Sequence, residues 1–211
     1  MFLNHYLVSR DPENGVQTMR TVTYGGAVSL DGFLAGVDGS IDWLHFSKDV
    51  QDIMTKYWKD VDTILMGRKT YDFVVSSGRE ASTRKKRTKA KPRKEPAVRR
   101  YVFSRTLQSI DESGVELVKG DAVEFVRGLK RRPGKGIGLM CGGELAQSLL
   151  GAGLVDRIGL NIHPILLGSG IPTFRDPGHR VNLTLVECRP LEGGCVLANY
   201  SVLHAEQSQS A

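Results

Sequence analysis

Residues 135–170 read KGIGLMCGGELAQSLLGAGLVDRIGLNIHPILLGSG, and this stretch says most about the fold. Two short apolar runs flank a segment whose leucines recur at helical spacing, and glycines separate the three parts. A strand, a helix and a strand in succession are typical of a parallel sheet, because parallel neighbours need a long crossover connection. The pattern predicts these three elements over 136–141, 143–151 and 155–162.

The same alternation continues on both sides of this stretch. Runs of β-branched and apolar residues predict strands, and apolar residues at helical spacing predict helices. Two apolar runs surround Glu192-Gly193-Gly194, which predicts a C-terminal antiparallel hairpin. The other expected strands cover 20–30, 61–67, 100–107 and 114–118, and the other expected helices cover 47–60, 68–75 and 121–131. The sequence therefore predicts one α/β domain with a mainly parallel sheet and an antiparallel edge.

The composition is that of an ordinary globular domain, with 211 residues, 40% of them apolar and 25% charged. The apolar runs are too short to cross a bilayer, and no basic region begins a signal peptide. Three cysteines at irregular spacing match no zinc motif and are expected to stay reduced. We therefore expect a cytoplasmic protein with no metal site and no membrane partner. Residues 1–19 and 205–211 are expected to be disordered, and an upstream start codon is a second explanation for the first eighteen.

The net charge of +6 is concentrated in one segment. Residues 79–100 hold eleven Lys and Arg against Glu80 and Glu95, a net charge of +9, which leaves −3 for the rest of the chain. Few apolar residues occur between 76 and 100, so we expect a long loop inserted into the domain. Three interpretations remain open: a solvated loop, a contact for nucleic acid or an acidic partner, or cations for a phosphorylated substrate. Nucleic acid is the weaker of these, because the segment lacks the aromatics that stack on bases.

Three turns that suit phosphate follow three of the predicted strands. Gly142-Gly143 begins a helix, where free N–H groups and the helix dipole favour an anion. Arg68 follows Gly67, and Arg105 follows Ser104; arginine can hold a phosphate through two hydrogen bonds. Taken alone, the Gly142-Gly143 turn is equally consistent with a tight turn that binds nothing. For each arginine taken alone, a solvated charge is the more common explanation. Together they would lie along one edge of a parallel sheet, which suits a dinucleotide with an extra phosphate, as in NADPH.

The order of these parts resembles the dihydrofolate reductase-like superfamily, and more closely the reductase domain at the C-terminus of bacterial RibD. The segments that carry the resemblance are SLDGFLAG…GSIDWL (29–44), ILMGRKTYD (64–72), YVFSRTL (101–107) and CGGELAQSLLGAGLVDRIGLNIHPILLGSG (141–170). The resemblance covers about 20–204 and implies a three-layer α/β/α fold. The implied sheet has about eight strands, mostly parallel, with a C-terminal antiparallel hairpin. It also implies a homodimer and hydride transfer from NADPH to a C=N or C=O bond of a small molecule.

The resemblance also implies roles for individual residues at the cofactor site. The Ala27 backbone would meet the nicotinamide carboxamide, and Asp31-Gly32 would turn the chain over the ring. The remaining implied cofactor-binding residues are Leu34 and Ala35 beside the ring, Gly67, Arg68, Lys69 and Thr70 at the phosphates, Ser104 and Arg105 at the adenosine ribose, and Cys141, Gly142, Gly143, Glu144 and Leu145 around the pyrophosphate.

The substrate side departs from the pattern of RibD. Phe33 stands where RibD-type turns carry Lys, and Cys141 stands where they carry Glu before the glycine pair. The basic segment replaces the part that recognises ribose phosphate, so the riboflavin intermediate is not the expected substrate. Asp31, Asp49 and Trp43 are the candidate catalytic residues, with His45 as a further proton donor.

A different class of function stays open beside the reductase. In that alternative the chain is a non-catalytic binding protein that keeps a dinucleotide fold and uses the basic segment 79–100 to bind nucleic acid or an acidic partner. A second enzymatic alternative is true pyrimidine reduction in riboflavin synthesis.

Overall fold

The computed structural model describes residues 19–85 and 98–204. Of the segments predicted to be disordered (1–19 and 205–211), all but Met19 fall outside these residues, as does the centre of the predicted loop. Among the described residues, no helix is both long and apolar enough to span a membrane.

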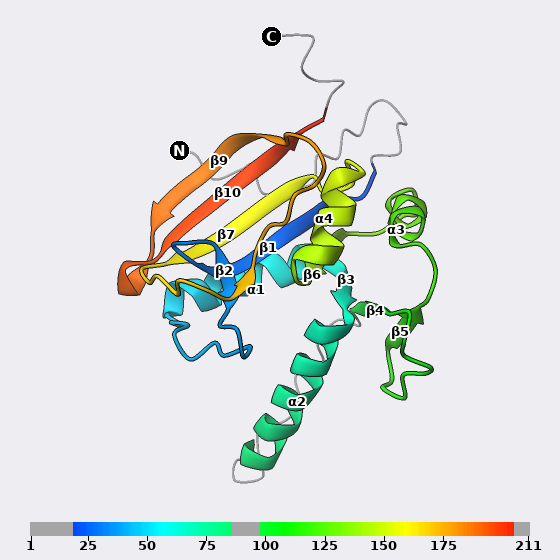
Figure 1. Ribbon diagram of the computed structural model, residues 1–211, viewed down its shortest axis with the longest axis horizontal. Coiled ribbons are helices and arrows are strands. Elements are labelled where there is room, and N and C mark those ends of the chain that lie inside the picture. The colour runs from blue at the N-terminus through cyan, green and yellow to red at the C-terminus, as the bar shows by residue number, and fades with distance from the viewer. Residues whose placement is uncertain (1–18, 86–97, 205–211) are drawn as a thin grey trace.

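Eight strands form one sheet in the order β5-β4-β3-β6-β1-β7-β10-β9, and a small second sheet pairs β2 with β8 (Figure 1). The pairs from β5 to β7 are parallel, whereas β10 runs antiparallel to β7 and β9. This arrangement confirms the predicted fold. The strands are β1 (Val22–Ser29), β2 (Phe33–Ala35), β3 (Val61–Gly67), β4 (Arg99–Phe103), β5 (Val115–Val118), β6 (Gly136–Met140), β7 (Arg157–His163), β8 (Ile171–Pro172), β9 (Asn182–Pro190) and β10 (Val196–Leu203).

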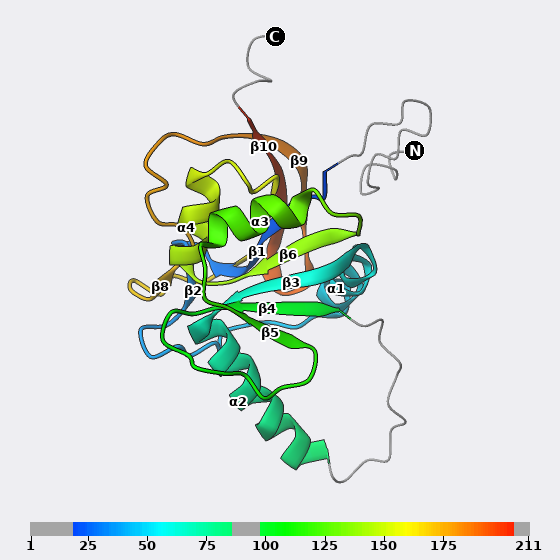
Figure 2. The ribbon, with the colours of Figure 1, turned by 90° about the vertical axis from the view of Figure 1, so that its right-hand side faces the viewer.

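Four helices cover the two faces of the sheet (Figure 2). They are α1 (Lys48–Asp60), α2 (Arg68–Lys85), α3 (Ala122–Lys130) and α4 (Gly143–Gly151). Helices α3 and α4 pack on the larger core, which includes Leu65, Leu139 and Leu149. Helix α1 packs on the opposite face, through Tyr57 against the core of β3 and through Val50 against the turn before β10. The layers are therefore α/β/α, as the resemblance implies.

Glycine permits the close contact between two central strands, β1 and β7. Gly25 pairs with Gly159 in the parallel register, and a Cβ built on Gly25 would lie only 1.8 Å from the Gly159 carbonyl oxygen. No side chain fits in this space. The small residues in TYGGAV therefore allow the two strands to pack closely, in addition to any room that they leave for a ligand.

Two buried cations secure the amino end of the sheet. Arg20 is 4% exposed, pairs with Asp62 and donates to the Thr63 hydroxyl at 2.8 Å. Lys130 is 5% exposed, and its Nζ lies 2.5 Å from a carboxylate oxygen of Asp156. Both cations have a carboxylate partner, as burial requires.

The structure differs from the sequence-based prediction at the basic segment. Helix α2 continues to Lys85, so residues 76–85, predicted as loop, are helical, and β4 already begins at Arg99. Arg, Lys, Glu and Ala favour helices even without an apolar face, and the prediction gave more weight to the missing apolar face. In Figure 1 the far end of α2 projects away from the sheet.

Candidate active site

The carboxyl ends of the parallel strands bring the predicted phosphate turns together. In the register of the sheet, Gly67 pairs with Phe103, and Met66 pairs with Met140. The segments that begin at Gly67, Ser104 and Cys141 therefore leave three adjacent strands at the same edge. Ligands of open α/β sheets bind at this edge.

Three glycines at this edge have no packing explanation within the described chain. A Cβ on Gly26 or Gly67 would meet no heavy atom within 4 Å, and one on Gly142 would meet only Ile171 Cγ2 at 4.0 Å. Their backbones do not require glycine either, since none of them has a positive φ. Gly26 is exposed although it lies in a central strand. Their strands, β3, β6 and β1, are neighbours in the sheet. The empty side-chain positions leave room for a ligand to approach the backbone.

Gly143, unlike its neighbour Gly142, lies in close contact with another segment of the chain. A Cβ here would lie 2.8 Å from Arg175 Cγ and 3.2 Å from the Pro172 carbonyl oxygen. The glycine pair therefore has two separate uses: Gly143 admits the 172–175 segment, and Gly142 leaves the N-terminus of α4 open.

The first turn of α4 has free N–H groups. No side chain caps it, because its N-cap residue is Gly142. Glu144 is exposed, and one of its carboxylate oxygens lies 3.7 Å from Arg175 Nη1. Cys141 is buried before this turn, and burial raises the pKa of its thiol to about 12. Leu145 is half-buried on the core formed by α3 and α4.

The basic side chains of the other two turns are exposed. Arg68 Nε donates to Asp72 Oδ2 at 2.7 Å on the surface of α2, and Lys69 is exposed beside it, with Thr70 half-buried. An exposed ion pair of this kind is weak and can open for a better anion. The Ser104 Oγ accepts the Leu107 N–H at 3.1 Å and so shapes its turn, which leaves Arg105 exposed.

Asp31 joins two segments that lie far apart in the sequence. Its oxygens accept the N–H groups of Gly168 at 2.7 Å and Leu167 at 3.2 Å. A hydrogen bond from the Ser29 side chain, helped by these N–H groups, lowers the pKa of Asp31. The Thr173 N–H donates to the Gly32 carbonyl at 2.9 Å.

The short strands β2 and β8 pair between the same two segments, so Leu34 and Ala35 belong to a fixed β2–β8 sheet. A Cβ on Gly170 would lie 2.2 Å from the Ala35 carbonyl oxygen, which shows how closely the two segments approach. The sequence did not predict this small sheet.

Asp49 has a similar set of hydrogen bonds at the start of α1. Its carboxylate accepts from the Ser47 hydroxyl, from the Val50 N–H at 2.8 Å and from the Glu192 N–H at 2.9 Å. The Ser47 hydroxyl is the main cause that lowers the pKa of Asp49. Asp31 and Asp49 thus both hold the backbone in place, and their catalytic roles stay predictions.

Trp43 lies against a buried histidine. Its ring meets the His163 ring edge-on, with centroids 5.2 Å apart. His163 is 2% exposed, and its Nε2 accepts the His45 N–H at 3.1 Å. Since its Nδ1 lies 3.1 Å from the Asn161 carbonyl oxygen, which can only accept, the imidazole is neutral and carries its proton on Nδ1. The His45 side chain is exposed.

The sequence analysis did not select Gly26, Asn161, His163 or Arg175. Asn161 pairs with Ala27 in the register, so it lies beside the predicted nicotinamide contact. The only available signal was its place one residue before the end of the strand predicted over 155–162. No group of His, Cys, Asp and Glu within the described ranges could hold a metal ion.

Comparisons with known proteins decide the family. The sequence profile of the RibD C-terminal domain matches residues 20–197. The chain belongs to the RibD C-terminal domain family. Two Bacillus subtilis relatives are the uncharacterized proteins YyaP, 37% identical over 82% of this chain and 90% of YyaP, and YwjB, 32% identical over 79% of this chain and 88% of YwjB.

Two solved structures share the fold. A candidate riboflavin biosynthesis protein from Shewanella sp. PV-4 has a TM-score of 0.71 at 25% identity, with 87% of this chain and 99% of that one covered. A deaminase and 5-amino-6-(5-phosphoribosylamino)uracil reductase from Thermotoga maritima has a TM-score of 0.61 at 18% identity, with 88% of this chain and 57% of that one covered. The second likeness concerns the fold alone.

Proposed function

We propose that this RibD C-terminal domain protein is an NADPH-dependent reductase of a small molecule. The observation that carries the proposal is the set of open glycines, Gly26, Gly67 and Gly142, at the carboxyl ends of three adjacent strands. Neither backbone conformation nor packing within the described chain accounts for them, and a dinucleotide along this edge does. NADPH supplies the hydride, and the chain positions the cofactor and the substrate.

Each part of the edge has a task in this proposal. The open N-terminus of α4 at Gly142 binds the pyrophosphate through backbone N–H groups. Arg68 and Lys69 bind the phosphate on the adenosine ribose, with Ser104 and Arg105 beside them. The Ala27 backbone holds the nicotinamide amide. The β2–β8 sheet covers the ring and keeps water from it.

A proton must also reach the substrate during reduction. Asp31 and Asp49 have lowered pKa values and hydrogen-bonded oxygens, so both are carboxylates at neutral pH. We therefore propose that water delivers the proton and that these carboxylates fix the loops around the site.

The substrate remains a separate question from the reaction class. Phe33 and Cys141 occupy positions where the riboflavin enzymes carry Lys and Glu. A C=N or C=O bond in a compound other than the phosphoribosyl pyrimidine is the proposed target. We further propose a cytoplasmic homodimer. Its edge strand β9 exposes 41% of Leu183 and 54% of Leu185, which favours association with a second copy.

Fluorescence titration with NADPH and NADH tests the cofactor proposal. Wild type should bind NADPH more tightly than NADH. Arg68→Ala should weaken NADPH binding about tenfold or more, since one hydrogen-bonded charge contributes about 1.5–3 kcal/mol. Lys56→Ala, an exposed change on α1, is the matched control and should bind as wild type does.

Folded protein that binds neither cofactor would overturn the reductase. The rival binding protein would then gain support from salt-sensitive DNA or RNA binding that is lost with residues 86–97.

A further inference from the structure

Residues 172–177 form a strap that runs along helix α4. In the middle of the helix, Gln147 Nε2 donates to the Asp176 carbonyl oxygen at 2.5 Å. At the last residue of the helix, a Cβ on Gly151 would lie 2.8 Å from the Pro177 carbonyl oxygen. Figures 1 and 2 both show the gold ribbon that follows β8 beside α4. The strap is therefore packed on the helix rather than free in solvent.

Two hydrogen bonds and a ring contact fix the start of the strap. The Tyr24 hydroxyl of β1 donates to the Thr173 carbonyl oxygen at 2.5 Å, and the Thr173 N–H donates to the Gly32 carbonyl oxygen at 2.9 Å. The Phe174 ring meets the Tyr24 ring edge-on, with centroids 5.7 Å apart. The backbone of the next residue, Arg175, is therefore held in a defined place.

The side chain of Arg175 lies against the first turn of α4. Its Cγ is 2.8 Å from the position of a Cβ on Gly143, so the glycine admits the aliphatic stem of the arginine. Its Nη1 lies 3.7 Å from a carboxylate oxygen of Glu144, which is longer than a hydrogen bond. The two side chains are 49% and 79% exposed. An exposed pair at this distance contributes little, so the guanidinium can leave it for a stronger anion.

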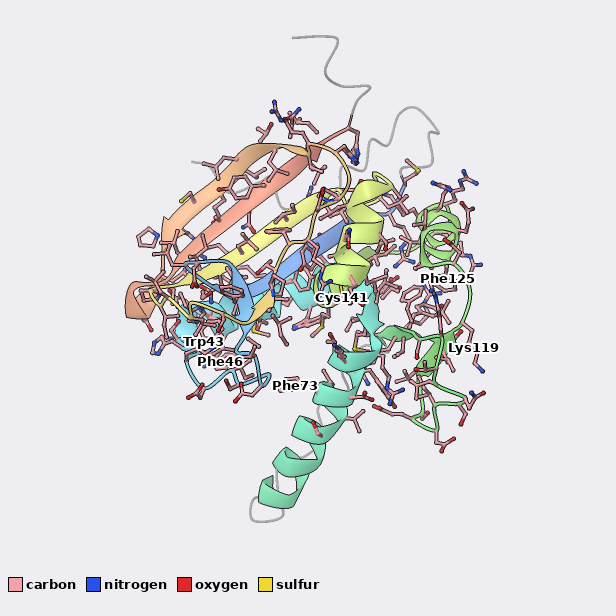
Figure 3. The ribbon with its side chains drawn as sticks, viewed as in Figure 1. Trp43, Phe46, Phe73, Lys119, Phe125 and Cys141 are labelled. Atoms are coloured by element: carbon pink, nitrogen blue, oxygen red, sulfur yellow. The ribbon has the colours of Figure 1, made fainter. Side chains whose placement is uncertain are left out.

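The open glycine of the proposed pyrophosphate site adjoins this arginine. Gly142 directly precedes Gly143, which the Arg175 stem touches, and the neighbour of its empty side-chain position is Ile171, just before the strap. Figure 3 labels Cys141 at the base of α4, and the faint orange ribbon of the strap passes beside that helix. The Arg175 guanidinium can therefore reach an anion held at Gly142.

The proposed NADPH site lacks a cation at this position. Arg68, Lys69 and Arg105 are assigned to the adenosine end of the cofactor, and backbone N–H groups alone are assigned to the pyrophosphate. Both phosphates of a pyrophosphate are ionised at neutral pH, and arginine binds such oxygens through paired N–H groups. Arg175 supplies the missing charge.

We propose that Arg175 is a further cofactor-binding residue, whose guanidinium leaves Glu144 and binds the pyrophosphate of NADPH at Gly142. Glu144 holds the arginine beside the site in the free protein and competes with the cofactor for it. This inference rests on the proposed NADPH site and adds to it a residue from the strap.

Arg175→Met tests the guanidinium alone, because methionine keeps an unbranched stem beside Gly143. It should bind NADPH about five- to twentyfold more weakly than wild type, and Arg175→Lys, which keeps a cation, should lose less. Arg180→Met, an exposed change of the same kind in the same loop, is the matched control and should bind as wild type does. Thermal unfolding without ligand should stay within about 2 °C of wild type in all three variants.

Glu144→Gln tests the competition for Arg175. Removing the carboxylate frees the guanidinium, so NADPH should bind about two- to fourfold more tightly. The same change combined with Arg175→Met should have a smaller effect, because the partner is gone. Unchanged or weaker binding in Glu144→Gln, or equal effects in both backgrounds, would overturn the competition. The single Glu144→Gln variant decides this point even if Arg175→Met unfolds.

Inorganic pyrophosphate separates this inference from the cofactor proposal. In calorimetric titration it should bind wild type and Arg180→Met equally, and Arg175→Met more weakly. NADPH binding that Arg175→Met leaves unchanged would overturn the role of Arg175 and leave the reductase standing. Pyrophosphate binding that depends on Arg175, without NADPH binding, would support Arg175 as a diphosphate-binding residue and overturn the reductase. Binding of neither compound would overturn both.

Discussion

His163 Nε2 accepts a hydrogen bond from the backbone N–H of His45 at 3.1 Å. This bond ties the loop that carries Trp43 to the end of β7, 118 residues further along the chain. Neutral His163 holds this loop in place through one acceptor and one donor nitrogen.

Replacing His163 should lower the stability of the protein. His163→Ala removes two hydrogen bonds and the ring contact with Trp43, so we expect a loss of about 2–4 kcal/mol in the free energy of unfolding. Urea denaturation measures it. His179→Ala, at an exposed position, should stay within about 0.5 kcal/mol of wild type. Equal stability of the two variants would contradict the assigned role.

The glycine pair provides a matched comparison of packing and binding. Gly142→Ala should leave the fold intact and weaken NADPH binding, because its Cβ enters open space before α4. Gly143→Ala should cost about 1–3 kcal/mol of stability, because its Cβ meets Arg175 and Pro172. Thermal unfolding and cofactor titration of both variants separate the effects. A reversal of this order would contradict the division of roles between the two glycines.

Asp62 should make stability depend on pH in the acid range. Burial opposes its ionisation, yet hydrogen bonds from the Lys135 N–H and the Thr63 hydroxyl, with the charge of Arg20, keep its pKa below the ordinary value. A carboxyl with a lowered folded pKa stabilises the protein above the unfolded value of about 3.9, and this contribution is lost as the pH falls through the folded pKa.

Urea denaturation at a series of pH values measures this contribution. Asp62→Asn should reduce the acid dependence and cost about 2–4 kcal/mol at pH 7, since Arg20 stays buried without its carboxylate. Asp72→Asn, in an exposed ion pair, is the control and should change little. An unchanged acid profile in Asp62→Asn would rule out this origin.

The cysteines should differ sharply in reactivity. Burial raises the pKa of the Cys141 thiol to about 12, and Cys195 is buried too, whereas Cys188 is exposed on β9. Iodoacetamide at pH 8 should therefore modify Cys188 in the folded protein and spare Cys141, because the thiolate is the reactive form. Mass spectrometry of tryptic peptides gives the pattern, with urea-unfolded protein as the control. Rapid modification of Cys141 would show that its environment is open.

The large elements of the fold could be predicted from the sequence because each has its own local signal. The strand that ends before Cys141 and the helix that begins at Gly143 follow from apolar runs and a glycine pair, and both lie where predicted. The short strands β2 and β8 have no such signal, because they exist only by pairing with each other. Their pairing joins segments more than 130 residues apart, which no local pattern encodes.

The candidate site divides in the same way. The predicted phosphate turns follow buried strands, so their common edge could be expected from topology alone. The partners of Asp31 could not, since Gly168 reaches it only after β7 has been placed beside β1. The sequence did not reveal Asn161, because its notable feature is a buried Oδ1 without a hydrogen-bond partner. Whether such an atom has a partner depends on which residues surround it in the folded structure.

The bond between Asp31 and Gly168 has a consequence for the order of events during synthesis. A ribosome completes the Asp31-Gly32 turn early, but the residues that bond to it emerge more than a hundred codons later. Strand β1 likewise waits for β6 and β7, its partners on either side. Such long-range closure slows folding and leaves the early apolar strand exposed to chaperones and to misassembly. A nascent chain truncated before Gly168 should therefore lack the shape of the candidate site, so the proposed NADPH binding would begin only after translation has passed this residue.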